Sequence, residues 1–90
     1  MKRVRLIISG DVQGVGFRAW VLRQARELEL VGWVKNRKDG AVEVVAEGSK
    51  EDLEELVKSC NHGPDVAWVE KVDIQWTEAT GEFMGFVVVY

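Results

Sequence analysis

Apolar positions recur along the chain with two different periods, and the points where the period changes mark the predicted elements. In residues 3–10 every second residue is apolar (Val4, Leu6, Ile8), which is typical of a strand with one face on a core. From Phe17 onward the spacing becomes helical. The complete pattern predicts strands at 3–10, 31–36, 41–48, 67–77 and 83–90, and helices at 17–30 and 50–61.

Turn and cap residues support these boundaries. Asp39-Gly40 predicts a tight hairpin between the second and third strands. Ser49 precedes an acidic first turn and is typical of an N-cap for the second helix. Gly63-Pro64 follows the last apolar residue of that helix, so the helix is expected to stop there.

The order of the elements predicts an α+β fold of the ferredoxin-like βαββαβ type. This is a sandwich with a mostly antiparallel sheet, an added C-terminal strand, and both helices on one face. Strand 3–10 is expected to lie inside the sheet and to run in the same direction as strand 31–36. In strand 67–77, Val69 is out of phase with the apolar residues after it, which predicts a β-bulge near Glu70.

Composition narrows the classes of function. Ninety residues leave room for one domain, expected to span residues 1–90. The formal net charge of −3 argues against a nucleic-acid partner, because such proteins usually carry a positive surplus. No apolar run approaches the ~18 residues that cross a membrane, and no segment is typical of a signal peptide. A cytoplasmic protein without a membrane partner is therefore expected.

The single cysteine and the single histidine offer little chemistry. Cys60 lies on the apolar stripe of the second helix, which predicts a buried, inert thiol rather than a nucleophile. His62 follows in the predicted loop, where no partner group orients it, and we expect it to be solvated.

The candidate chemistry lies in the loop between the first strand and the first helix. Its glycines, Gly10, Gly14 and Gly16, allow backbone conformations in which successive N–H groups converge on an anion. The helix that follows adds the positive end of its dipole, and Arg18 adds a planar fork that matches phosphate oxygens. The spacing fits neither the P-loop nor the dinucleotide-binding pattern. An ordinary tight turn that needs glycine only for its backbone is the alternative interpretation.

Two other segments are expected to reach this loop. Strands 3–10 and 31–36 end at the same edge of the predicted sheet, so Asn36 should neighbour the loop. An amide side chain beside a phosphate cradle could orient a small nucleophile. If the strand 83–90 lies parallel to the second strand, the α-carboxylate of Tyr90 could form an ion pair with Arg18; a frayed terminus is the alternative.

Two stretches of the chain resemble the signatures of the acylphosphatase family. The first is Ile8-x-Gly10-x-Val12-Gln13-Gly14-Val15-x-Phe17-Arg18, and the second is Gly32-Trp33-Val34-Lys35-Asn36-x-x-x-Gly40-x-Val42. Shorter matches, at Gly48, Gly63-Pro64, Ala67, Val69 and Gly85-Phe86, extend the resemblance over essentially the whole chain.

The resemblance implies hydrolysis of the carboxyl–phosphate bond of a small acyl phosphate to a carboxylate and inorganic phosphate, without metal, cofactor or covalent phosphoenzyme. Inorganic phosphate is then both product and competitive ligand, and the protein is expected to be a monomer. By the same resemblance Arg18 and Asn36 are the catalytic residues, one holding the phosphate and the other positioning the attacking water. The backbone amides expected to bind the phosphate belong to Gln13, Gly14, Val15, Gly16 and Phe17.

Two alternatives to catalysis stay open at this point. A non-catalytic anion-binding or regulatory module could share the fold, although Arg18 and Asn36 are both present. An RNA-binding sheet needs exposed aromatic residues on its middle strands. Here those strands carry charged and aliphatic residues, so the RNA-binding alternative ranks much lower.

Overall fold

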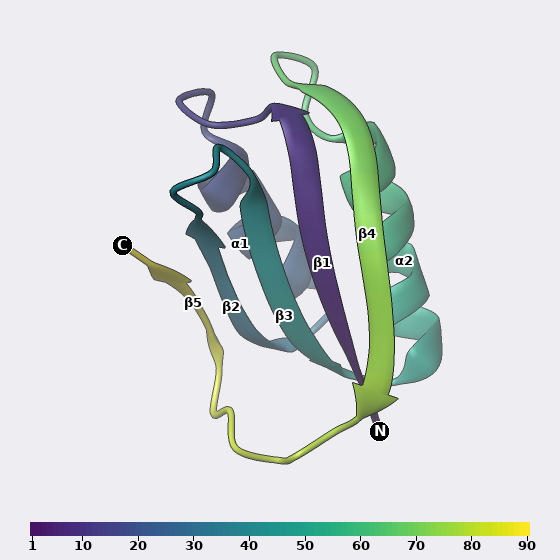
Figure 1. The fold of residues 1–90 in the computed structure, drawn as a ribbon. Helices are drawn as coiled ribbons and strands as arrows, with labels where there is room; N and C mark the ends of the chain where they lie inside the picture. Colours follow the sequence, from purple (N-terminus) through teal and green to yellow (C-terminus); the bar gives the residue numbers. More distant parts are fainter.

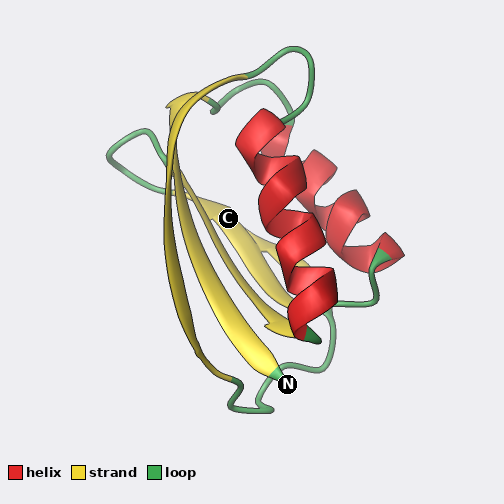
Figure 2. Ribbon diagram, turned by 90° about the vertical axis from the view of Figure 1, so that its right-hand side faces the viewer, coloured by secondary structure: helices red, strands yellow, loops and turns green.

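The computed structural model describes residues 1–90 as two layers, a five-stranded sheet and two helices that cover one of its faces (Figures 1 and 2). The elements are β1 (Lys2–Asp11), α1 (Phe17–Glu27), β2 (Val31–Asn36), β3 (Val42–Gly48), α2 (Lys50–His62), β4 (Trp68–Glu78) and β5 (Phe86–Val89). The predicted ferredoxin-like α+β sandwich with an added C-terminal strand is confirmed. Neither helix has the length and hydropathy needed to cross a membrane.

The sheet order, β4-β1-β3-β2-β5, places β1 inside the sheet, as predicted. Strands β1 and β2 both pair antiparallel with β3, so they run in the same direction. Their last residues, Asp11 and Asn36, therefore lie at one edge of the sheet. The arrowheads of both strands point upward in Figure 1. Strand β5 pairs with β2 in parallel and ends at that edge too.

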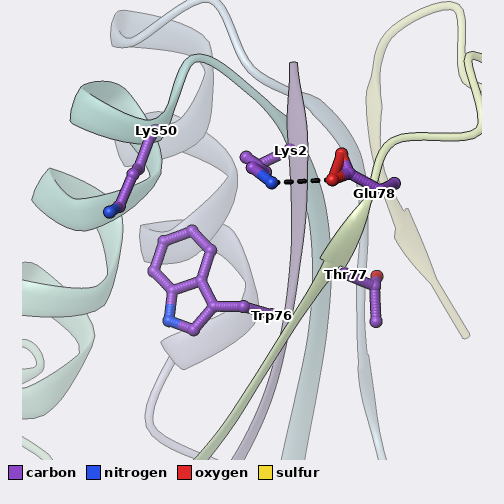
Figure 3. Close-up of a pocket in the computed structure, with 5 residues that line it drawn as sticks. All are labelled: Lys2, Lys50, Trp76, Thr77 and Glu78. Carbon is purple, nitrogen blue, oxygen red and sulfur yellow. Dashed lines mark hydrogen bonds and ion pairs between the residues drawn. The ribbon is translucent and has the colours of Figure 1, made fainter.

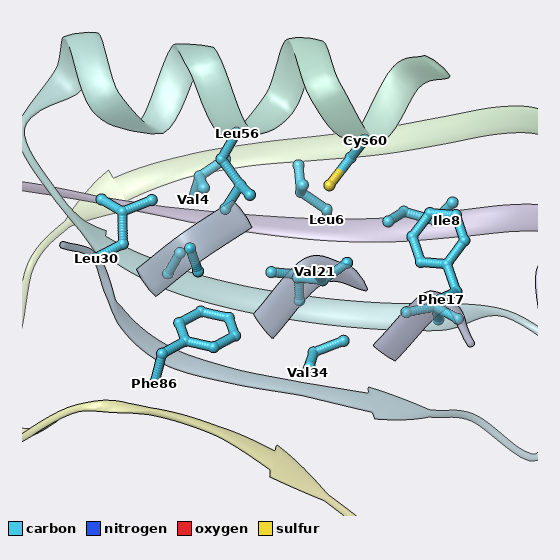
Figure 4. Close-up of a cluster of buried hydrophobic side chains, with 14 of the residues drawn as sticks. Val4, Leu6, Ile8, Phe17, Val21, Leu30, Val34, Leu56, Cys60 and Phe86 are labelled. Atoms are coloured by element: carbon cyan, nitrogen blue, oxygen red, sulfur yellow. The ribbon is translucent and has the colours of Figure 1, made fainter. Parts of the chain in front are cut away.

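The apolar stripes predicted from the two periods meet in a core between the sheet and the helices (Figure 4). Val4, Leu6 and Ile8 of β1 are fully buried. The helices contribute Phe17, Val21 and Ala25 from α1, and Leu53, Leu56 and Cys60 from α2. Burial of each large apolar side chain stabilises a fold by about 1.5–3 kcal/mol, so this cluster holds the helices on the sheet.

The predicted bulge in β4 is confirmed. Ser9 of β1 pairs with Lys71 and Gly10 pairs with Val69, so Glu70 is the extra residue on β4. The extra residue brings the out-of-phase Val69 back onto the face that packs against the core.

This bulge also changes the interpretation of Gly10. Gly10 belongs to β1 and has a φ of +132°, and a Cβ on it would lie 2.2 Å from the carbonyl oxygen of Trp68. Only glycine fits so close to the neighbouring strand. Gly10, assigned from the sequence to the anion loop, therefore serves the packing of the sheet, and Gly14 and Gly16 are the glycines that shape the loop.

Two helix ends differ from the prediction. Helix α1 ends at Glu27 instead of continuing to residue 30, and Glu29 takes a left-handed φ of 56°. Helix α2 continues to His62, which is therefore helical, not in the loop, although it is exposed as expected. Cys60 is buried as predicted, and burial raises the pKa of its thiol to about 12, which leaves the thiol inert.

The last strand is shorter than predicted. Strand β5 begins at Phe86, not at Phe83. Residues 79–85 form a loop that runs from β4, the outer strand on one side of the sheet, to β5, the outer strand on the other side (Figure 1). The carboxylate of Glu47, on β3, holds this loop by hydrogen bonds. The Glu47 side chain is 2% exposed.

Glu47 is a buried carboxylate satisfied from several directions. It accepts hydrogen bonds from the backbone N–H groups of Thr80 and Gly81 at 2.9 and 3.1 Å, and from the Arg3 guanidinium at 2.7 Å. Burial by itself raises the pKa of Glu47. The hydrogen bonds from Thr80 and Gly81, together with Arg3, outweigh burial, so the pKa of Glu47 lies below its ordinary value.

Glu47 should therefore make stability fall in acid. Because its folded-state pKa is depressed, its contribution is fully present above the ordinary pKa of 4.5 and is lost as the pH falls through the lowered value. We expect Glu47→Gln to lower the free energy of unfolding by about 1–3 kcal/mol near neutral pH. Urea unfolding at about pH 7 and about pH 3 should show the gap to the unmodified protein narrowing in acid. A gap of constant size would contradict this role.

Candidate active site

The loop between β1 and α1, residues 12–16, is anchored at both ends by the core. Val12 and Phe17 are each 1% exposed. Between them, Gly14 and Gly16 have φ angles of +76° and +80°, in the left-handed region that disfavours residues with a Cβ. The core therefore fixes where the loop starts and ends, and the two glycines decide its course.

The backbone N–H groups of this loop and of the first turn of α1 are free. None of residues 13–19 donates a backbone hydrogen bond within the protein. Gly16 is the N-cap of α1 and supplies no side-chain cap, so the first-turn N–H groups of the helix keep their unmet hydrogen-bonding capacity. Unpaired N–H groups beside the positive end of a helix dipole form a binding place for an anion such as phosphate.

Arg18 adds a positive charge that the protein does not neutralise. The arginines on the sheet and its hairpin, Arg3, Arg5 and Arg37, all form ion pairs with carboxylates. Arg18, the second residue of α1, forms none; its guanidinium lies over the Tyr90 ring, 4.7 Å from the ring centre. The ion pair considered between Arg18 and the Tyr90 carboxylate is therefore absent, and the aromatic ring is the actual neighbour.

Asn36 and the loop face the same hollow. This hollow, of about 210 Å³, is lined by Gly14, Gly16, Phe17 and Arg18 from the loop and helix, by Asn36 at the end of β2, and by Tyr90 after β5. The side chain of Asn36 forms no hydrogen bond with another protein group. The structure thus brings together the arginine and the asparagine that the sequence predicted to be neighbours.

The residues that line the hollow are not all the ones predicted from the sequence. Gln13 and Val15 are not part of the lining, although their backbone N–H groups are unpaired. The side chain of Val15 packs against the core. Val88 and the ring of Tyr90 were missed as lining residues, because the parallel pairing considered from the sequence was used only to place the Tyr90 carboxylate.

A second hollow, of about 370 Å³, lies at the other end of β1 (Figure 3). It is lined by Lys2, Lys50, Trp76, Thr77 and Glu78. Lys2 and Glu78 form an ion pair with each other at 2.7 Å, so part of its charge is already neutralised. None of the predicted site residues lies there, and we place the candidate active site at the Arg18 end of the sheet.

Free loop amides, an unpaired arginine and a carboxamide at one edge of a ferredoxin-like sheet define a small α+β protein suited to binding phosphate. The family model for acylphosphatases matches residues 4–88. The chain is 50% identical over 91 residues to an acylphosphatase from Thermococcus kodakarensis, with 99% of each chain covered. It is 48% identical over 87 residues to one from Salinibacter ruber, covering 97% of this chain and 92% of the relative. The crystal structure of acylphosphatase from Bacillus subtilis superposes with a TM-score of 0.96, at 38% identity and complete coverage of both chains.

The chain belongs to the acylphosphatase family. It is accordingly an enzyme, and the family implies a small-molecule acyl phosphate as substrate. These likenesses span essentially the whole chain.

Gly14 offers a test of the loop geometry. We expect Gly14→Ala to lower kcat/KM by about 10-fold or more, because alanine is strained at a positive φ and the loop would shift to relieve the strain. Gly81→Ala is a matched control, since Gly81 has a φ of +74° against +76° for Gly14 and both have open space where a Cβ would lie. Steady-state kinetics and melting of both variants separate lost activity from lost stability. Equal activity in the two variants would contradict a role for Gly14 in the site.

Proposed function

We propose that this acylphosphatase hydrolyses its substrate by in-line attack of a water molecule that Asn36 positions on a phosphate held by Arg18 and the loop amides. The amides concerned belong to Gln13, Gly14, Val15, Gly16 and Phe17. The proposal rests on one observation. Around a single hollow, the N–H groups of the loop have no hydrogen-bond acceptor and the Arg18 guanidinium has no carboxylate partner.

Phosphoryl transfer depends on charge neutralisation and alignment more than on acid or base groups. The transition state spreads negative charge over the equatorial oxygens, which Arg18 and the amides would bind. The carboxylate leaving group departs without protonation by the enzyme. The lining of the hollow contains no carboxylate side chain and no imidazole. We therefore propose that a phosphate oxygen of the substrate accepts the proton of the attacking water.

Within this proposal the reaction needs no metal ion, because the guanidinium and the helix N-terminus supply the positive charge. The test is hydrolysis of benzoyl phosphate with and without excess chelator. Turnover that the chelator leaves unchanged is the expected result. Turnover that stops with the chelator and returns with added divalent cation would contradict a metal-independent reaction.

The non-catalytic anion-binding module considered from the sequence is not favoured by any observation, since the chain belongs to a family of enzymes. Such a module would bind inorganic phosphate and release no benzoate. The proposed mechanism instead makes inorganic phosphate a product that competes with the substrate, so it should raise the apparent KM and leave kcat unchanged. Phosphate binding without any turnover would favour the module.

Four expectations from the sequence accompany the proposal and stay predictions. They are that residues 1–90 act as one domain, that the protein is a monomer, that it works in the cytoplasm, and that it binds no nucleic acid. Size-exclusion chromatography with light scattering tests the second, and a shift assay with mixed RNA and DNA tests the fourth.

A further inference from the structure

The side chain of Gln13 links two parts of the site that are far apart in the sequence. Its Nε2 donates hydrogen bonds to the backbone carbonyl oxygens of Arg37, at 2.7 Å, and Ala41, at 3.0 Å. Gln13 lies in the phosphate loop, whereas Arg37 and Ala41 belong to the β2–β3 hairpin, which begins directly after Asn36. Figure 1 shows this loop and this hairpin side by side at the upper edge of the sheet.

The hairpin itself is well ordered by other bonds. Arg37 N–H donates to the Ala41 carbonyl at 2.8 Å, and Gly40 N–H donates to the Arg37 carbonyl at 3.3 Å. The Arg37 guanidinium forms ion pairs with Asp39 and Glu43. The hairpin is therefore an ordered unit, attached to the sheet through Val42, which pairs with both Asn36 of β2 and Ile8 of β1.

Between the phosphate loop and the tip of the hairpin, Gln13 supplies the only hydrogen bonds. No other hydrogen bond, from backbone or side chain, joins residues 12–16 to residues 36–41. Both amide hydrogens of Gln13 are used, one on each side of the turn, so the contact restrains the hairpin in direction as well as in distance.

We propose that Gln13 is a positioning residue, whose side chain holds the hairpin next to Asn36, and with it the end of β2, in register with the loop that binds the phosphate. The proposal rests on the proposed roles of the loop and Asn36. In-line attack requires the water and the phosphorus to be aligned, and a small displacement of one partner has a large effect on the rate. The backbone N–H of Gln13 can serve the phosphate while its side chain serves Asn36.

The first test is Gln13→Met, which keeps an unbranched side chain of similar length and removes the donors. We expect kcat to fall about 10-fold or more while the Kd for inorganic phosphate changes less than about 3-fold, because Arg18 and the loop amides stay in place. Gln75→Met is the control, since Gln75 is exposed on β4, away from the hollow, and its side chain accepts one hydrogen bond, from Arg5. Unchanged kcat would overturn the proposal, as would an equal loss of kcat and phosphate affinity.

The second test asks whether Gln13 acts through Asn36. In an Asn36→Ala background, Gln13→Met should lower kcat less than about 2-fold, because the group it positions is already gone. If the loss of kcat in the double variant equals the product of the two single losses, Gln13 acts independently of Asn36 and the proposal is overturned.

The third test needs no turnover and so separates this proposal from the proposed function. Gln13→Met should speed hydrogen exchange at the Arg37 and Gly40 amides about 10-fold, while exchange in the core of β1 stays unchanged. Unchanged exchange at the hairpin amides would contradict the proposal that Gln13 holds the hairpin. If Asn36→Ala by itself keeps full activity, the proposed role of Asn36 fails instead, and the exchange experiment still decides whether Gln13 holds the hairpin.

Discussion

Arg18→Ala is expected to lower kcat/KM by roughly 10³-fold, through both a higher KM and a lower kcat. Arg18 would contact the phosphate in the ground state and would bind more strongly as charge develops on the equatorial oxygens. The guanidinium has no carboxylate partner in the protein, so its removal leaves no buried charge unpaired. The loss should therefore appear in catalysis and phosphate binding, with little change in stability.

The matched control for this variant is Arg23→Ala. Arg23 lies on the same helix, is exposed, and forms no ion pair, so its removal changes the net charge equally at a site away from the hollow. Phosphate titration calorimetry and benzoyl phosphate kinetics on both variants separate a local effect from a general loss of positive charge. Equal losses in the two variants would contradict a specific site at Arg18.

Arg18→Lys adds information on geometry. Lysine keeps the charge but loses the planar fork and the stacking surface that lies over Tyr90. We expect it to recover only part of the lost activity. Full recovery would mean that charge alone matters at this position.

Asn36→Ala is expected to lower kcat by roughly 10²-fold or more and to leave the binding of inorganic phosphate largely intact. The reason is that Asn36 lines the same hollow as the loop but comes from the end of β2, and in the proposed mechanism it acts on the attacking water, not on the phosphate. Calorimetry in which this variant loses phosphate binding would overturn the division of roles between Asn36 and Arg18.

Asn61→Ala is a suitable control for the loss of a carboxamide. Asn61 is exposed near the end of α2 and donates only to the Val57 carbonyl within its own helix. It should keep full activity. Asn36→Asp is a stricter probe, because a carboxylate of the same shape would repel the phosphate and should raise KM as well as lower kcat.

Local patterns in the sequence were sufficient for most of the fold. The alternation of Val4, Leu6 and Ile8 predicts β1, and Ser49 predicts the start of α2, where its hydroxyl oxygen accepts a hydrogen bond from Asp52 N–H at 3.2 Å. The broken phase at Val69 predicts the bulge. Each of these signals depends on residues a few positions apart, because hydrophobic period and helix capping are local properties of the chain.

The candidate site was partly predictable for the same reason. Glycines in a strand-to-helix turn, followed by an arginine, indicate an anion loop from local chemistry alone. The adjacency of Asn36 followed from topology, since strands that run in the same direction end at the same edge. The resemblance to acylphosphatases then connected both to one reaction.

Tertiary structure alone decided which polar groups are used up and which stay free. The buried Glu47 accepts hydrogen bonds from the N–H groups of Thr80 and Gly81 and so holds the loop that precedes β5. Gly10 is required by the close approach of Trp68, and Gln13 reaches across to the hairpin. These contacts join residues far apart in the chain, and their partners depend on distances of a few ångströms that no period or motif encodes. Arg18 is available for phosphate because the folded chain places an aromatic ring beside it, where the sequence also allowed a carboxylate.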